Sequence, residues 1–467
     1  MSGKFYIATF GCRVNQADSA AIKAQLETEG LRQSEDISDC SFVIVNSCTV
    51  THSSDQQVRQ MIRRLRRQNP AARILVTGCY AQGNPKEIAA MPEVDLILGN
   101  LEKSRISDFV KEFASSEFRV AGGEIEQSAG VHSPTLPLPR SPTLPLQLPS
   151  YFNSSKIFVS NLSRETEIEV QPVATLEGKT RPFVKIQEGC DSRCTYCIVP
   201  FVRGAGRSVP PESVISQVRR LIDDGYKEVV LTGIHLGSYG SKLHPRTRLE
   251  DLIARLLDLP RLEQLRLSSI EPMRFSRKLI DLAEQESRFA PHFHLPLQSG
   301  ANEILRRMDR NYDRRHYADL LTEIHNRLPH ASIGTDVMAG FPGESEALFE
   351  ETLQFVRQMP FSYLHVFPYS RRSGTPAADM ASQVDESLKH RRVTALRRCS
   401  DEKLRAFSDR FVGTRLRALI LHEREAEYWT GLTGNYLKVK VPVEVAQVNE
   451  FVDVRIERRG EVLYGAC

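Results

Sequence analysis

The chain has 467 residues and a net charge of +4, with 41% hydrophobic and 26% charged residues. This length is too great for one hydrophobic core and predicts about three domains of an ordinary soluble protein. The sequence lacks an apolar run of about 18 residues, which argues against a membrane-spanning helix. It also begins without the apolar core of a signal peptide. Its nine cysteines are too dilute for a disulfide scaffold, so we expect a cytoplasmic protein whose clustered cysteines bind metal.

The first hundred residues alternate between short apolar runs and amphipathic stretches. Helices are predicted at about residues 17–29 and 55–68. Before, between and after these helices lie apolar runs suited to buried parallel strands: Phe5–Phe10, Phe42–Asn46, Ile74–Thr77 and Leu96–Leu98. The alternation predicts an α/β fold, with an N-terminal open parallel sheet in a domain of residues 1–120.

Residues 121–179 interrupt this pattern. They contain a short direct repeat rich in proline, Ser133–Pro139 followed by Ser141–Gln147. Proline at this density opposes both helix and sheet pairing. We therefore expect an extended or disordered linker.

Strand and helix alternate again in residues 180–410, with a longer spacing. Helices are predicted at Pro211–Asp223, Leu249–Leu257 and Glu346–Gln358. The candidate strands are Phe183–Gln187, Glu228–Leu231, Gln264–Ser268, His292–Leu295, Ser332–Val337 and Tyr363–Phe367. Six consecutive βα units predict a central partial (β/α)6 barrel.

The last part of the chain changes character again. Residues near 385–409 read as a helix, and short alternating strands such as Leu437–Val441 and Phe451–Ile456 follow it. Turn residues separate these strands. This pattern predicts a small C-terminal β-barrel in residues 411–467.

Three cysteines lie within eight residues directly after the first predicted barrel strand: Cys190, Cys194 and Cys197. A Cys-x3-Cys-x2-Cys run supplies three thiolates, whereas a cubane [4Fe–4S] cluster has four irons. The fourth iron would remain free to bind another molecule. The spacing therefore favours a reactive cluster over one that only carries electrons.

Glycine-rich or polar loops follow each barrel strand, where parallel strands collect ligands. Gly233 lies in the loop after the second strand, and Glu271 in the loop after the third. Glycine there lets the backbone approach a ligand closely. Each loop alone reads as an ordinary turn, but together around three cysteines they predict a binding site.

The N-terminal sheet repeats this arrangement, because Cys12, Cys48 and Cys79 each follow one of its first three predicted strands. The carboxyl ends of parallel strands meet at one edge, so the three cysteines are expected to meet there and hold a second cluster. Any one of them alone is better explained as a small buried hydrophobe. We expect structural roles for the remaining cysteines and packing or loop roles for three histidines that could also be ligands: Cys40, Cys399, Cys467, His235, His292 and His294.

Two basic groups lie on predicted helices. The sequence favours equally a solvated helix face and a set of phosphate contacts to RNA. The first group is Arg59, Arg63, Arg64, Arg66 and Arg67, and the second is Lys389, Arg391, Arg392, Arg397 and Arg398.

The order of these features resembles the methylthiotransferase family of radical S-adenosylmethionine enzymes. Phe183–Cys190 and Ile198–Gly204 are close to the family pattern, and the last domain resembles the small TRAM β-barrel. The resemblance covers nearly the whole chain outside the proline-rich segment. That segment is longer than the family usually shows, and the second barrel strand lacks the Gly-Gly-Glu sequence of many radical S-adenosylmethionine enzymes.

The resemblance implies a transferase with two [4Fe–4S] clusters and S-adenosylmethionine as cofactors, served by an electron donor. The cluster on Cys190, Cys194 and Cys197 would bind S-adenosylmethionine and cleave it to a 5′-deoxyadenosyl radical. The cluster on Cys12, Cys48 and Cys79 would carry the sulfur, and a second S-adenosylmethionine would supply the methyl group. By the same resemblance, the residues that contact the cofactor would be Tyr196 beside the adenine, Gly233 and Glu271.

Three segments resemble the branch that acts on N6-threonylcarbamoyladenosine of tRNA, next to the anticodon. They are Thr232–Gly240, Leu267–Pro272 and Gly334–Glu344. The implied reaction is radical methylthiolation of C2 of that base, with the tRNA anticodon stem-loop as partner. Methylthiolation of another tRNA adenosine or of a ribosomal protein side chain is the nearest alternative. A non-catalytic RNA-binding protein stabilised by zinc is the alternative from another class.

Overall fold

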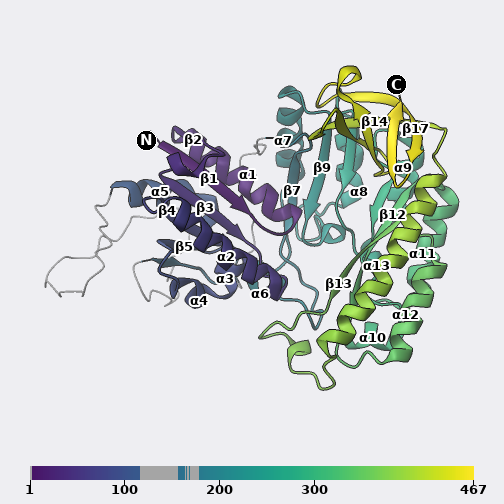
Figure 1. The fold of residues 1–467 in the computed structure, drawn as a ribbon, viewed down its shortest axis with the longest axis horizontal. Helices are drawn as coiled ribbons and strands as arrows, with labels where there is room; N and C mark the ends of the chain where they lie inside the picture. The colour runs from purple at the N-terminus through teal and green to yellow at the C-terminus, as the bar shows by residue number, and fades with distance from the viewer. Residues whose placement is uncertain (1–2, 116–155, 163–164, 166–167, 169–177, 467) are drawn as a thin grey trace, which may run out of the picture.

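The computed structural model of the protein describes residues 3–115, 156–162, 165, 168 and 178–466. An N-terminal α/β unit lies beside a central barrel, and a small C-terminal β-barrel covers one end of the central barrel (Figure 1). The described residues include no helix that is both long and apolar enough to cross a membrane.

The N-terminal unit is the predicted open parallel sheet, with strand order β2-β1-β3-β4-β5-β6. Its central strand β3 is buried along its whole length, as expected for a strand with neighbours on both sides. The strands are β1 Gly3–Thr9, β2 Leu31–Gln33, β3 Phe42–Ser47, β4 Arg73–Gly78, β5 Leu96–Leu98 and β6 Ile157–Phe158. The helices are α1 Arg13–Thr28, α2 His52–Gln68, α3 Cys79–Gly83, α4 Pro85–Ala89 and α5 Ile106–Ser115.

The prediction of a linker over residues 121–179 is wrong at Ile157–Phe158, which form a strand. Ile157–Phe158 pairs with β5 as the edge strand β6, and the amide of Gly99 donates a hydrogen bond to the carbonyl of Phe158 at 2.8 Å. Strand β5 gains partners for its free backbone groups in this way. A two-residue strand is too short to show periodicity, so the sequence did not predict it. The proline-rich repeat itself lies outside the described residues.

The central barrel has the predicted six parallel strands within the described part of the chain. Strands β10-β9-β7-β8 form one sheet, in which the short β8 is antiparallel, and β11-β12-β13 form the other. Isolated parallel bridges, Leu265 with Phe289 and Ser269 with His294, join the two sheets. The strands are β7 Phe183–Glu188, β8 Arg207–Ser208, β9 Glu228–Gly233, β10 Gln264–Leu267, β11 His292–His294, β12 Ser332–Ala339 and β13 Tyr363–Pro368. The helices are α6 Val199–Arg203, α7 Pro211–Asp223, α8 Leu249–Leu257, α9 Lys278–Gln285, α10 Asn302–Arg307, α11 Arg314–Arg327 and α12 Glu346–Gln358.

The C-terminal β-barrel is closed, as predicted, in the order β14-β15-β16-β18-β17. Helix α13, Glu386–Asp409, leads into it. The small barrel packs against the central barrel through Tyr436, whose ring stacks on His292 with centroids 4.1 Å apart. Its strands are β14 Arg415–Glu425, β15 Tyr428–Thr433, β16 Lys438–Pro442, β17 Phe451–Arg459 and β18 Val462–Ala466.

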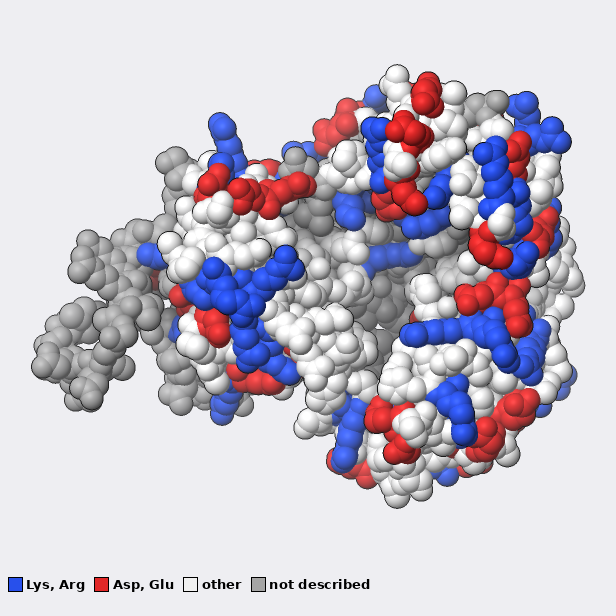
Figure 2. Space-filling model, viewed as in Figure 1, with Lys and Arg blue, Asp and Glu red and all other residues white. Residues whose placement is uncertain are grey.

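The N-terminal unit contacts both sides of the central barrel. On the first side, Arg203 of α6 donates a hydrogen bond to Asp18 of α1 at 3.0 Å. On the other, Arg372, which follows β13, pairs with Asp55 of α2 at 2.8 Å. The partial barrel is open between its first and last strands, so these two arginines hold the N-terminal unit across the opening. Figure 2 shows the surface hollowed between the two parts, with Lys and Arg side chains along the hollow.

Candidate functional site

Cys190, Cys194 and Cys197 lie in a tight loop at the carboxyl end of β7, as the sequence predicts. Gly189 precedes the first of them with a φ of +70°, and a Cβ there would strike the carbonyl of Ala205. The amide of Cys190 donates to the carbonyl of Gly204 at 3.0 Å. All three thiols are free of disulfides. The loop therefore holds three sulfurs on a backbone that tolerates only glycine at its start.

Arg310 and His235 contact this first trio. Arg310 donates from Nη1 to Sγ of Cys194 at 3.2 Å and forms an ion pair with Glu271. The Nδ1 atom of His235 lies 3.6 Å from Sγ of Cys190. The sequence predicted Glu271 as a contact and missed Arg310, which lies far along the chain. His235 is a loop histidine, as expected, but one placed against a cluster cysteine.

Residues that the sequence assigned to the cofactor lie on loops at the same end of the barrel. The ring of Tyr196 packs edge-on against Phe341, with centroids 6.4 Å apart. Gly233 ends β9, and a Cβ on it would come within 2.9 Å of the Gln187 side chain. Glu271 follows β10 and pairs with Arg310. These positions form one rim around the first trio.

Cys12, Cys48 and Cys79 meet at the carboxyl edge of the N-terminal sheet. Cys12 caps the start of α1 after β1, Cys48 follows β3, and Cys79 begins α3 directly after β4. Gly11 and Gly78 precede two of them with φ of +93° and +98°. A Cβ on Gly11 would lie 2.7 Å from Sγ of Cys48. The same device, a left-handed glycine directly before a cysteine, thus occurs at both trios.

Two of the six thiols are held in their neutral form by burial. Burial raises the pKa of Cys48 to about 11, and the neighbouring thiols of Cys79 and Cys12 contribute to the rise. Burial likewise raises the pKa of Cys197 to about 12. Such thiols stay neutral at pH 7 unless a cation compensates the thiolate charge, which is what a bound metal does. Each trio supplies three sulfur donors, which is the ligand type of an iron–sulfur cluster.

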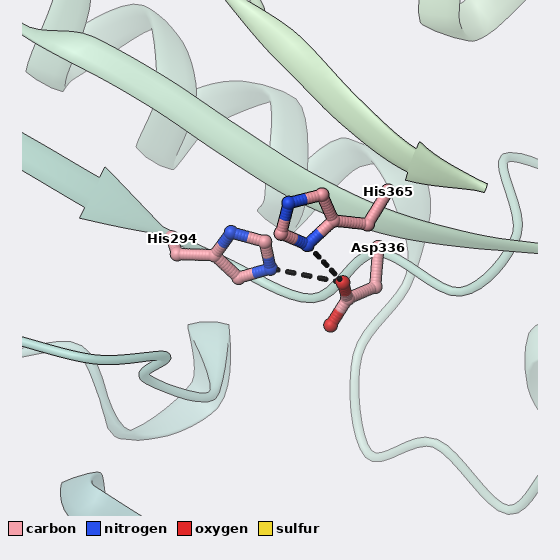
Figure 3. A group of neighbouring side chains, drawn as sticks. All are labelled: His294, Asp336 and His365. Atoms are coloured by element: carbon pink, nitrogen blue, oxygen red, sulfur yellow. Dashed lines mark ion pairs between the residues drawn. The ribbon is translucent and has the colours of Figure 1, made fainter. Parts of the chain in front are cut away.

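The spacing of the sulfurs opposes the zinc alternative. A single ion needs its ligand atoms in one coordination shell. Within the part of the chain that the structure describes, the only group of three His, Cys, Asp or Glu side chains with ligand atoms within 4.8 Å of one another is His294, Asp336 and His365 (Figure 3). Neither cysteine trio is that compact. A [4Fe–4S] cluster gives each thiolate its own iron, so its ligands stand farther apart.

A buried ion network joins the two trios. Arg203, only 1% exposed, donates from Nε to Sγ of Cys79 at 3.2 Å and pairs with Glu188 beside the first trio. Asp18 accepts from Arg203, Lys103 and Lys185. Although burial opposes ionisation, these three cations hold the pKa of Asp18 well below its usual range. The sequence did not predict this network. Its one signal was an arginine just before Gly204, in the segment that follows the first trio.

The remaining cysteines lie outside both trios, and the two basic groups each contain paired and exposed side chains. Cys40 and Cys399 are buried away from both trios, and Cys467 lies outside the described residues. In the first basic group, Arg59 pairs with Glu87 and Arg66 with Asp95. In the second, the buried side chains of Lys389 and Arg392 pair with Glu386 and Glu344. The exposed members of the two groups are Arg63, Arg64, Arg67, Arg391, Arg397 and Arg398.

Gly11→Ala is expected to prevent assembly of the N-terminal cluster. The new Cβ would occupy the space of the Cys48 sulfur. Iron after anaerobic reconstitution should fall from about eight to about four per chain. Gly225→Ala is the matched control, because Gly225 has nearly the same φ of +92° but no atom within 4 Å of the position that a Cβ would take. Equal iron in both variants would contradict the assignment.

Two family descriptions match the chain. Residues 4–99 match "Uncharacterized protein family UPF0004", and residues 184–356 match "Radical SAM superfamily". A solved structure with a similar fold is the radical S-adenosylmethionine methyltransferase TsrM from Kitasatospora setae, with a TM-score of 0.56 and 13% identity. The alignment covers 81% of this chain and 77% of that one.

Curated relatives align along most of the chain. The threonylcarbamoyladenosine tRNA methylthiotransferase MtaB of Bacillus subtilis is 34% identical, with 97% of this chain and 93% of the relative covered. The enzyme of the same name from Aquifex aeolicus is 37% identical, with 94% and 96% covered. The tRNA-2-methylthio-N(6)-dimethylallyladenosine synthase of Natranaerobius thermophilus is 32% identical, with 97% and 94% covered. With a cysteine trio at the carboxyl edge of each parallel sheet unit and this extent of similarity, the chain belongs to the family of radical S-adenosylmethionine methylthiotransferases.

Proposed function

We propose that the protein methylthiolates C2 of N6-threonylcarbamoyladenosine in tRNA, next to the anticodon. The relatives named for this base support the choice, at 34% and 37% identity over more than nine-tenths of the chain. Two relatives named for the dimethylallyl base are 32% and 34% identical, and the second of these aligns with only 84% of the chain. As a member of its family, the protein is a transferase that uses two [4Fe–4S] clusters and S-adenosylmethionine.

The two trios have different roles in this proposal. Cys190, Cys194 and Cys197 hold the cluster that binds S-adenosylmethionine, and Cys12, Cys48 and Cys79 hold the second cluster. When bound, these groups supply a carbon radical that removes hydrogen from C2, and the sulfur and methyl group that replace it. The relatives named for this base carry the proposal. The Arg203 contact supports joint action of the two trios, because it links the Cys79 sulfur to Glu188 beside the first trio.

The remaining residues of the site orient the first cysteine trio and hold the N-terminal unit against the barrel. Arg310 is held by Glu271 and donates to Cys194, so it fixes one side of the first trio. Arg372 and Arg203 keep the N-terminal unit against the barrel. A primary carbon radical removes hydrogen from many nearby C–H bonds, so holding the base close and keeping other C–H groups away are the main tasks of the protein. The hydrogen abstraction needs no general acid or base. We place the enzyme in the cytoplasm with its tRNA and an electron donor.

Replacing Arg63, Arg64 and Arg67 together by alanine is expected to weaken RNA binding several-fold. These exposed side chains lie on α2, which begins four residues after Cys48, and Figure 2 shows basic side chains gathered on the N-terminal unit. Each lost phosphate contact should lower the slope of log affinity against log salt by about 0.7 to 0.9. Binding of an anticodon stem-loop at several salt concentrations measures this. Arg397→Ala with Arg398→Ala on α13 is the control, and an equal loss in both variants would contradict the placement.

The test of the function is nucleoside mass spectrometry of tRNA from cells with and without the protein. We expect 2-methylthio-N6-threonylcarbamoyladenosine to disappear when the protein is absent and to return with the wild-type gene. Loss of the 2-methylthio dimethylallyl nucleoside instead would assign the enzyme to the other tRNA substrate. If cells without the protein keep normal tRNA and instead lose the methylthio group of a ribosomal protein, the RNA proposal is overturned.

A further inference from the structure

A second group of ligand-forming side chains lies on the strands of the central barrel and contains no cysteine. His294 ends β11, Asp336 lies within β12, and His365 lies within β13. The strand register pairs Asp336 directly with His365, and His294 with Gly334 two residues before Asp336. The three side chains therefore project from neighbouring strands toward one point (Figure 3).

The distances within this group suit a metal ion. The Nε2 atom of His294 lies 3.0 Å from Oδ1 of Asp336, and Nδ1 of His365 lies 3.4 Å from the same oxygen. Metal–ligand bonds of about 2.0 to 2.1 Å at tetrahedral angles place neighbouring ligand atoms about 3.3 Å apart. Both observed distances are close to that value, so an ion can be bound with little movement of the three side chains.

The orientation of His294 is fixed by a neighbour. The Nδ1 atom of His294 lies 3.3 Å from the hydroxyl oxygen of Tyr363. The same hydroxyl oxygen lies 2.8 Å from Nε2 of His292. A histidine ligand usually binds metal with one nitrogen while the other is held by a hydrogen bond. Tyr363 supplies the hydrogen-bond partner for Nδ1 of His294, and Nε2 of His294 is directed at Asp336.

One side of the group is open. The His294 side chain is 5% exposed, that of Asp336 is 23% exposed and that of His365 is 59% exposed. A site with three protein ligands and an open side keeps a coordination position for water or for an oxygen atom of a substrate. Two imidazoles and one carboxylate suit divalent transition metals more than Mg²⁺ or Ca²⁺, which prefer oxygen ligands.

We propose that His294, Asp336 and His365 form a binding site for a divalent transition metal such as Zn²⁺, separate from the two iron–sulfur clusters. The site stands on its own geometry and does not depend on which base the enzyme modifies. The alternative is a hydrogen-bonded group in which both rings donate to Asp336 and no ion binds.

Zinc uptake by the anaerobically reconstituted holoenzyme tests the proposal. After dialysis against low-micromolar Zn²⁺, we expect about one zinc per chain in addition to the full iron content. Zinc X-ray absorption should show nitrogen and oxygen neighbours at about 2.0 to 2.2 Å and no sulfur at about 2.3 Å. Sulfur neighbours, or zinc gained only as iron is lost, would mean that zinc enters the cysteine sites and would overturn the proposal.

Two variants localise the ion. Asp336→Asn keeps the shape of the side chain but removes its charge, and His365→Ala removes a half-exposed ring with little effect on packing. Each should weaken zinc binding at least ten-fold while leaving the iron content unchanged. His316→Ala, an exposed histidine on α11, is the control and should bind zinc as the wild type does. Equal zinc in the wild type and in both variants, or none in the wild type, would show that the group is hydrogen-bonded only.

Discussion

Replacing Cys12, Cys48 and Cys79 together by alanine is expected to abolish methylthiolation while leaving cleavage of S-adenosylmethionine intact. The three thiols lie on the N-terminal sheet, whereas Cys190, Cys194 and Cys197 lie on a separate loop of the barrel. Removing one trio therefore leaves the backbone of the other in place. Iron should fall from about eight to about four per chain. Product should fall below detection by mass spectrometry, while 5′-deoxyadenosine is still formed when a reductant is added.

The reciprocal variant and a matched control complete this test. Alanine at Cys190, Cys194 and Cys197 should abolish both the product and 5′-deoxyadenosine. Cys40→Ala with Cys399→Ala removes two buried thiols that lie in neither trio, and it should keep full iron and activity. Methylthiolated nucleoside at the wild-type level in the Cys12, Cys48 and Cys79 variant would overturn the assignment of the second cluster.

Arg203→Met is expected to impair both the contact between the two parts of the protein and the chemistry at Cys79. Arg203 is buried and pairs with Asp18 and Glu188, so its removal breaks a buried ion network. Breaking such a pair typically costs about 3–5 kcal/mol. The variant should melt at a lower temperature. We expect methylthiolation to fall at least ten-fold, while formation of 5′-deoxyadenosine falls less.

The reduction potential separates a specific role of Arg203 from a general loss of stability. Arg203 donates to the Cys79 sulfur at 3.2 Å, and hydrogen bonds to cluster sulfurs raise the potential. Redox titration followed by electron paramagnetic resonance should show a lower potential for the N-terminal cluster in Arg203→Met and a smaller shift in Arg203→Lys. Arg219→Met, which replaces an exposed arginine on α7, should change neither quantity. An unshifted potential in a destabilised Arg203→Met protein would limit Arg203 to a structural role.

Much of the fold could be predicted from short stretches of sequence. Helices Pro211–Asp223, Leu249–Leu257 and Glu346–Gln358 have the predicted bounds, because each has an apolar face of helical period. Helix α1 begins at Arg13, four residues before the predicted start, because its first turn carries no apolar stripe. Strand β5, Leu96–Leu98, was predicted because all three of its residues are apolar, whereas β2 has one apolar residue and β6 has only two residues in all.

By itself, the sequence determined the order of the domains and the placement of the two cysteine trios. A cysteine that follows a parallel strand must lie at the carboxyl edge of the sheet, because all strands of the sheet run the same way. Only the tertiary structure decided that Arg203 contacts Cys79, 124 residues away, that Arg310 contacts Cys194, 116 residues away, and that His294, Asp336 and His365 converge. An isolated arginine or histidine has no local pattern that distinguishes a buried partner from a solvated side chain. Its partner is chosen by how distant segments pack, which no short window of sequence records.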